Sequence, residues 1–427
     1  MLHRRTPSRT PARRGAVVVA VAIGLVAILG VVALSLDGGL LMDKRRQAFC
    51  AADAAALAAA SDMYMNWWAN KGTDPSGSAA AAARAAAEAN GYKHGANGCT
   101  IEVHIPPRTG PFAGQAGHTE VIIAHAQPRY FSRLFGSERI DYGARAVSRG
   151  RRSSIMNAII CLDPTGKGAL NAGGNGGVLV TGAPVQVNSS NAEAMIANGN
   201  GTMSANPFLV TGSPGWSTPG GGSFTGTIVP NSVPIPDPLA YLPPPDPSSL
   251  ILREKNKVQI SGNRTVDLLP GLYQGGISAS GGTINLAPGI YYMQGGGFNI
   301  GGQANLRGTG VMIYNAPTSN SDTISIAGQG SIVLSPPLTG PYQGICFFQD
   351  RTSTTPVSVS ASPGVEYSIT GTFYAASADL SVTGNGENNV IGSQYISYRL
   401  NLGGNGKYFC SWDPNLTPGT RDILLVE

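Results

Sequence analysis

Two short segments place a histidine and a glutamate on the same face of an expected strand, a pattern that some zinc sites use. Glu102 and His104 lie two residues apart, and so do His118 and Glu120. A solvated hairpin face produces such pairs far more often than a metal site does. We therefore predict that the chain holds no metal and no cofactor.

Catalytic combinations are not evident in the glycine-rich half of the chain. All five histidines lie at or before His125, which excludes a Ser–His or Cys–His pair there. Gly384-Asn385-Gly386 resembles a phosphate loop, but no helix pattern follows it. The acidic residues between 251 and 410 are scattered: Glu254, Asp267, Asp322, Asp350, Glu366, Asp379 and Glu387. We predict no enzymatic activity and no catalytic residue; a solenoid enzyme that degrades polysaccharide is the weakest alternative.

The five cysteines are Cys50, Cys99, Cys161, Cys346 and Cys410. Outside the cytoplasm they can form two disulfides and leave one thiol. Cys346 and Cys410 both lie in apolar, strand-like runs, and we predict a disulfide between them. Buried free thiols are the alternative.

The charge distribution argues against nucleic acid as a partner. Five arginines lie within the first 14 residues, and the remaining residues carry 24 Lys and Arg against 24 Asp and Glu. A nucleic-acid-binding protein needs a basic face. The other basic cluster, residues 145–152, is interpreted as a solvated connector.

An uncharged segment, residues 15–36, predicts a membrane anchor. Its 22 residues would span about 33 Å as a helix, close to the thickness of a hydrocarbon core. A cleaved signal peptide is the alternative, although its apolar region is usually shorter. Because the arginine-rich arm, residues 1–14, contains no acid, we expect it to stay in the cytoplasm. The bulk would then lie in the periplasm or outside the cell, held by one helix in the inner membrane.

Residues 37–152 predict a small pilin-like α+β region. Helix should continue from the anchor to about Trp68, and a second alanine-rich helix should run from Ser78 to Asn90, with Gly91 as its stop. These alanines indicate either high helix propensity or a packing face for another subunit. Strands are expected over residues 100–105, 118–123 and 139–147, with a short aromatic helix over 129–136.

Residues 153–427 contain a recurring phrase of two apolar residues one apart, a small residue and glycine. Its copies end at positions 262, 302, 328, 384 and 404, and looser copies end at positions 281 and 361. This period predicts one turn of a right-handed β-helix, with the apolar pair inside. A β-sandwich is the alternative. The proline-rich segment, residues 229–247, is interpreted as a spacer or as an excursion along the solenoid wall.

The N-terminal residues resemble a known family. Arg13-Arg14-Gly15-Ala16 opens the apolar segment, Leu36-Asp37-Gly38-Gly39 closes it, and Gln47 leads into an alanine-rich run. This combination resembles the N-terminal domain of TadG-like proteins of Tad (Flp) pilus assembly. The residues that carry the resemblance are Arg14, Gly15, Asp37, Gly39, Gln47, Ala52, Asp53, Ala54, Ala55 and Leu57.

The resemblance implies an envelope component that helps to build or anchor a thin pilus, or a related secretion apparatus. Its partners would be other pilus-assembly or envelope proteins and, through the helix, membrane lipid. Pseudopilin relatives carry a glutamate five residues into the mature chain, where this sequence has Ala20, so we expect a retained anchor. A cell-surface adhesin or glycan-binding solenoid is the alternative function.

Overall fold

The computed structural model describes residues 14–131 and 139–427. These residues form two compact units: the first comprises the described residues up to Arg151 together with Asp422–Glu427, and the second is Arg152–Arg421. The last six residues, which the sequence analysis assigns to the solenoid, therefore belong to the N-terminal unit. The solenoid is an insertion between two strands of that unit, because β3 (Arg139–Ser154) leads into it and β33 (Gly419–Leu425) leads out.

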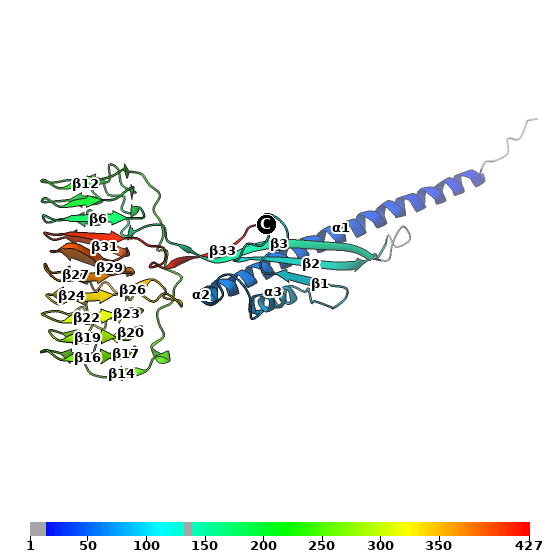
Figure 1. Cartoon of the computed structure of the whole chain (residues 1–427). Helices are drawn as coiled ribbons and strands as arrows, with labels where there is room; N and C mark the ends of the chain where they lie inside the picture. The colour runs from blue at the N-terminus through cyan, green and yellow to red at the C-terminus, as the bar shows by residue number, and fades with distance from the viewer. Residues whose placement is uncertain (1–13, 132–138) are drawn as a thin grey trace, which may run out of the picture. The chain divides into compact units, whose positions relative to one another are not determined.

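The first unit is built on one long helix, α1 (Arg14–Met65), drawn in dark blue in Figure 1. Its first half is apolar and exposed, and its second half, from Ala48 onward, carries a buried alanine face. The short helix α2 (Trp67–Asn70) follows. The continuation of the anchor as helix is therefore confirmed to Met65.

The second alanine-rich helix, α3 (Ser78–Ala89), packs its Ala79, Ala83 and Ala87 against α1. It ends as predicted at Gly91, which has a φ of +89°. The N–H of Gly91 donates to the carbonyl of Glu88, and the N–H of Tyr92 donates to that of Ala87, the pattern of a Schellman motif. The buried alanines thus serve packing within this chain; the alternative of a face for another subunit is wrong for them.

The sheet of this unit has the order β1-β2-β3-β33, with β1 at Thr100–His104 and β2 at His118–Pro128. The hairpins β1–β2 and β2–β3 are antiparallel. Ile101, Val121, Ile123 and Ala146 from the sheet complete the core with the alanines of the two helices. The expected aromatic helix over 129–136 extends outside the described residues.

The second unit is a parallel β-solenoid, which excludes the sandwich alternative (Figure 1). Its first part contains β4 (Ile159–Cys161), β5 (Leu170–Ala172), β6 (Gly177–Thr181), β7 (Val185–Val187), β8 (Met195–Ala197), β9 (Thr202–Ser204), β10 (Phe208–Val210), β11 (Trp216–Ser217), β12 (Ser223–Thr225) and β13 (Ile228–Val229).

After the proline-rich segment and a 3-10 turn at Pro247–Ser249, the solenoid resumes. Its second part contains β14 (Leu252–Glu254), β15 (Val258–Ile260), β16 (Thr265–Leu268), β17 (Gly271–Gln274), β18 (Ile277–Ala279), β19 (Thr283–Leu286), β20 (Gly289–Gln294), β21 (Phe298–Ile300), β22 (Asn305–Gly308), β23 (Val311–Ala316), β24 (Ile324–Gly328), β25 (Ile332–Leu334), β26 (Ile345–Gln349), β27 (Val357–Ala361), β28 (Tyr367–Ile369), β29 (Thr372–Gly384), β30 (Glu387–Ile391), β31 (Gln394–Gly403) and β32 (Lys407–Ser411).

The recurring phrases stack in register. Val258 pairs with Ile277, Ile277 with Phe298, and Phe298 with Ile324. The same row then continues through Val357, Leu380 and Leu400 to Leu170 and Met195. Alternate residues of these strands are buried in the common core, so the predicted repeat is one turn of the stack.

The stack is not wound in sequence order. The chain enters in the middle, at β4 to β6, and winds outward to β13; after residues 230–251 it restarts at β14 to β16, the opposite end (Figure 1). It then winds back until β31 and β32 pair with β4, β5 and β6. At this seam Arg399 donates to Asp163 at 2.6 Å, and Asn175 donates to Asn405 at 3.2 Å.

The proline-rich segment is the excursion along the wall that the sequence analysis considered, and we call residues 230–251 the strap. Its Leu239 and Leu242 are buried on the outer face of the solenoid, in a cluster that includes Tyr314, Phe348 and Tyr374. Proline-dense chain is stiff and extended, which suits a segment that must run from one end of the stack to the other.

Candidate functional site in the N-terminal unit

The apolar half of α1 has the properties of a membrane span. The helix over Val17–Met65 is long and apolar enough to cross a bilayer, and it carries few buried residues in its apolar window. Large aliphatic side chains, including those of Val18, Ile23 and Ile28, are about two-thirds exposed. A helix that is hydrophobic all round and uncovered by its own chain is suited to lipid.

Asp37 lies where the apolar segment ends, and it is only 6% exposed. Its carboxylate accepts hydrogen bonds from the backbone N–H of Phe131, at 3.3 Å and 3.2 Å. A carboxylate at this depth needs such donors because burial without them is costly. Asp37 therefore attaches the segment that follows β2 to helix α1, at the end of the apolar segment.

Two further residues of the motif lie along the same helix. A Cβ at Gly39 would meet no neighbouring atom, so nothing in this chain explains that glycine. The Gln47 amide donates to Asp43 at 2.8 Å and accepts from Lys44 at 3.0 Å. Gln47 also lines a cavity with Lys44, Tyr92 and His125.

The alanine-rich part of the motif divides between two faces of α1. Ala52 and Ala55 are fully buried and pack into the core of the unit. Asp53, Ala54 and Leu57 lie on the half-buried face. Burial raises the pKa of the Asp53 carboxyl. The motif therefore combines residues that form the fold with residues that remain accessible.

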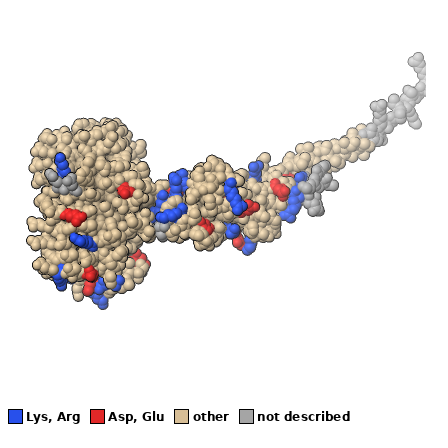
Figure 2. All heavy atoms as spheres, viewed as in Figure 1, with Lys and Arg blue, Asp and Glu red and all other residues tan. Residues whose placement is uncertain are grey.

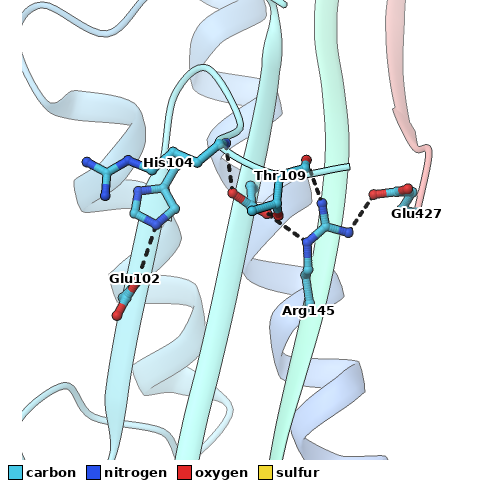
Figure 3. Close-up of polar contacts among 7 residues, drawn as sticks. Glu102, His104, Thr109, Arg145 and Glu427 are labelled. Carbon is cyan, nitrogen blue, oxygen red and sulfur yellow. Dashed lines mark hydrogen bonds and ion pairs between the residues drawn. The ribbon is translucent and has the colours of Figure 1, made fainter. Parts of the chain in front are cut away.

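A polar network joins β2, β3 and the chain's C-terminal residue (Figure 3). The Glu120 side chain is fully buried and accepts from Arg145 Nε at 2.7 Å. It also accepts from the Arg108 N–H at 2.9 Å and from the Thr109 hydroxyl. The other side of the Arg145 guanidinium pairs with Glu427 and donates to the Thr109 carbonyl at 3.0 Å.

The electrostatics of this network stabilise a charged Glu120. Burial acts to raise the pKa of its carboxyl, but the hydrogen bonds from Thr109, the Arg108 N–H and Arg145 outweigh burial, and the pKa is lowered. The carboxylate therefore stays ionised and holds Arg145, which in turn holds Glu427.

A second set of ion pairs attaches β33 to β3. Asp422 accepts from Arg149 at 3.0 Å and from Arg151 at 3.0 Å. Together with Arg145, these residues show that the basic cluster at 145–152 is not a solvated connector, as the sequence analysis interpreted it. Its arginines bind acids near the C-terminus, which lie more than 270 positions away.

The two histidine–glutamate pairs do not form a common site, because their side chains have different partners. His104 Nε2 lies 3.2 Å from Glu102 Oε2 near the surface, whereas Glu120 is engaged with Arg145. The ring of His118 instead stacks on Phe112, with centroids 4.8 Å apart. In the described part of the chain, no group of three or more His, Cys, Asp or Glu is placed to hold a metal ion.

The predicted Cys346–Cys410 disulfide is not formed, and both residues are buried free thiols. Cys346 lies in β26 of one sheet and Cys410 in β32 of another. The turn that contains β29 lies between the turns of these two strands. Successive turns rise about 4.8 Å, which places the two thiols beyond disulfide reach. Of the five cysteines, Cys50 alone is exposed.

The acidic residues of the solenoid do not converge in a polar cleft on its surface. This cleft, of about 360 Å³, is lined by Thr, Ser and Asn side chains from the loops 316–320 and 350–355. Asp350 is its one acidic lining residue, and its carboxylate is occupied by Tyr314 and Thr352. Hydroxyls and amides of this kind are suited to binding polar ligands rather than to acid–base chemistry.

Comparison with known families identifies one part of the chain. Residues 15–62 match the family model described as "Putative Flp pilus-assembly TadE/G-like". The match covers the apolar half of α1 and most of its alanine-rich half. The chain therefore carries a TadE/G-like N-terminal segment followed by a β-solenoid, and this segment supports involvement in the pilus system. No curated protein and no solved structure matches the chain.

The residues that close the N-terminal unit have no local signal in the sequence. Glu427, Asp422 and β33 have no apolar periodicity that separates them from the solenoid. The available signal was charge: Arg145, Arg149 and Arg151 are spaced by four and two positions, which places them on one face of a strand. Half-buried arginines on one face require acidic partners.

Proposed function

We propose that this protein is a membrane-anchored structural component of a Tad/Flp-type pilus assembly or secretion machinery. The N-terminus lies in the cytoplasm, and both folded units lie on the other side of the inner membrane. Its role is to support assembly through the anchor helix and the β-rich body, and it is not an enzyme.

The observation that carries this proposal is the continuity of α1. One helix joins an exposed apolar segment to an alanine face buried in a folded unit, and the TadE/G-like match spans both. Because the anchor helix continues into the core of the N-terminal unit, it fixes that unit to the membrane. Such a protein serves as a fixed support and needs no catalytic group.

The orientation is supported by the charges that flank the apolar segment. Residues 1–14 carry five arginines and no acid, whereas Lys44, Arg45 and Arg46 on the far side stand among aspartates. The positive-inside rule assigns the first flank to the cytoplasm.

Cys50 supplies a native probe of that orientation, because it is exposed and the other four cysteines are buried. We expect a membrane-impermeant maleimide to label the wild-type chain in intact spheroplasts, and Cys50→Ser to remain unlabelled. Labelling that appears only after lysis would place the body in the cytoplasm and contradict the proposal.

The pilus role is tested by replacing the anchor in a piliated host that lacks the native gene. A chain without residues 15–36, exported by a cleaved signal peptide, should fail to restore pili. A chain whose 22-residue segment is exchanged for an unrelated Leu/Ala helix of equal length should restore them. Normal piliation by the anchorless chain would refute the proposed role.

The second candidate function, a cell-surface adhesin or glycan-binding module, is favoured by the polar cleft beside Asp350. Its Thr, Ser and Asn side chains are groups that hydrogen-bond sugar hydroxyls. Intact pili combined with lost attachment to glycan surfaces, after substitution of Thr354 and Asn320 by alanine, would favour this function over the first.

A further inference from the structure

The two ends of the solenoid carry different side chains. Strands inside the stack pair with a neighbour on each side, whereas β12 and β16 end the ten-stranded sheet. An end strand presents unpaired N–H and C=O groups and is a template for pairing with another chain. The side chains at each end therefore decide whether its unpaired backbone groups are open to another chain.

The end formed by β14, β15 and β16 is protected by charge. Six charged residues lie within this single turn: Arg253, Glu254, Lys255, Lys257, Arg264 and Asp267. In Figure 2 blue and red side chains gather at this end, at the bottom of the solenoid in that view. Charged side chains on an edge strand oppose pairing because association would bury them.

The end formed by β11, β12 and β13 has no such protection. The sequence contains no Asp, Glu, Lys or Arg between Glu193 and Asp237, and the upper end of the solenoid in Figure 2 is correspondingly free of blue and red. Trp216 of β11 is 40% exposed and Val229 of β13 is 39% exposed. Phe224 and Ile228 cover the last layer of the core only in part.

We propose that this uncharged end, formed by residues 211–229 with β11, β12 and β13, is a self-association surface on which a second copy of the chain stacks, uncharged end against uncharged end. This interaction goes beyond the proposed pilus role and does not depend on it. Apolar side chains and edge backbone groups of the two copies cover each other.

The difference in charge between the ends selects this arrangement. Stacking the uncharged end on the charged end of another copy would remove charged side chains from water, and the facing surface would offer them no opposite charge. Pairing two uncharged ends avoids that cost and uses the same surface twice. Such an isologous contact closes at two copies, so the product is a dimer and not a fibre.

The geometry is tested by cross-linking in the purified full chain in detergent, with Cys50→Ser to remove the exposed thiol. Thr225→Cys in β12 and Thr265→Cys in β16 are matched variants, because both threonines are exposed and lie in the two edge strands of one sheet. We expect a short bismaleimide to convert Thr225→Cys to a dimer and to leave Thr265→Cys monomeric. Equal cross-linking of both, or cross-linking of one variant to the other in a mixture, would overturn the proposal.

The energetics are tested by light scattering with the detergent mass subtracted. The wild-type chain should have the mass of a dimer, Thr225→Lys should lower that mass about twofold, and Thr265→Lys should not. An unchanged thermal transition checks that each variant is folded. A wild-type chain that is monomeric at all concentrations, or a folded Thr225→Lys that stays dimeric, would overturn the proposal.

Discussion

The Glu120 carboxylate accepts hydrogen bonds from three donors in the N-terminal unit. It is fully buried, yet it remains ionised because Thr109, the Arg108 N–H and Arg145 all donate to it. Through Arg145 it also holds Glu427. One carboxylate thus links a loop, two strands and the end of the chain.

Replacing Glu120 by glutamine should lower the free energy of unfolding by about 1–3 kcal/mol, because Arg145 loses a charged partner but stays partly solvated. Glu102→Gln is the matched control; its carboxylate is exposed and should contribute less than about 1 kcal/mol. Chemical denaturation at neutral pH measures both, and equal effects would contradict the assigned role.

The lowered pKa of Glu120 also makes a prediction about pH. Its contribution is present above the pKa of glutamate in the unfolded chain and is lost as the pH falls through the lower folded-state pKa. The stability difference between wild type and Glu120→Gln should therefore be largest at neutral pH and shrink below about pH 4. Denaturation curves between pH 3 and pH 7 measure it; a constant difference would be inconsistent.

Helices α1 and α3 pack against each other through alanine side chains, and the small size of alanine sets how closely the helices approach. Ala83 of α3 is fully buried, whereas Ala85, two residues later, is exposed. Small side chains allow close helix packing, and close packing leaves no space for a longer side chain.

Ala83→Leu should destabilise the N-terminal unit by about 1–3 kcal/mol through overpacking. Ala85→Leu adds the same atoms to the same helix at the surface and should change stability by less than about 0.5 kcal/mol. Thermal denaturation of the two variants compares them directly. Similar losses from both would show that Ala83 is not tightly packed.

Glycines at the solenoid corners have a steric role that differs along the stack. Gly297 and Gly262 both have positive φ, +67° and +71°. A Cβ at Gly297 would lie 2.2 Å from the Thr323 carbonyl oxygen of the next turn, but a Cβ at Gly262, in the end turn, would meet nothing. The same residue type is therefore required by stacking at one position and by backbone conformation alone at the other.

Gly262→Ala should cost about 1–2 kcal/mol, the price of a left-handed conformation for an L-residue. Gly297→Ala should cost clearly more, because the strand of the next turn must also shift. Urea denaturation measures the ordering of the two variants. The reverse ordering would mean that the turns are not as closely stacked as described.

At the scale of the whole molecule, the solenoid is closed by two devices that join distant parts of the chain. The seam pairs the last turn with the first, and the strap connects the two ends. Arg351 holds the strap: it donates to the Leu239 carbonyl at 2.7 Å and to the Leu242 carbonyl at 3.0 Å.

Arg351→Met should release the strap and increase protease cleavage within residues 230–251, because two backbone carbonyls lose their donor. Arg307→Met removes an exposed arginine from β22 and serves as the control. Limited proteolysis with mass spectrometry locates the cuts. Cleavage unchanged from wild type would show that apolar packing of Leu239 and Leu242 holds the strap without Arg351.

Local patterns in the sequence were sufficient for many of the elements, although not for β33. The uncharged run predicted α1, Gly91 marked the end of α3, and the spacing of phrases such as Val258–Gly262 predicted the solenoid turn, because each signal depends on residues close together in the chain. The tertiary structure decided the rest: that β33 returns to pair with β3, that the solenoid restarts at its far end, and that Arg145 meets Glu427. These contacts join residues separated by hundreds of positions, and no local periodicity records which distant strand or charge will be the partner.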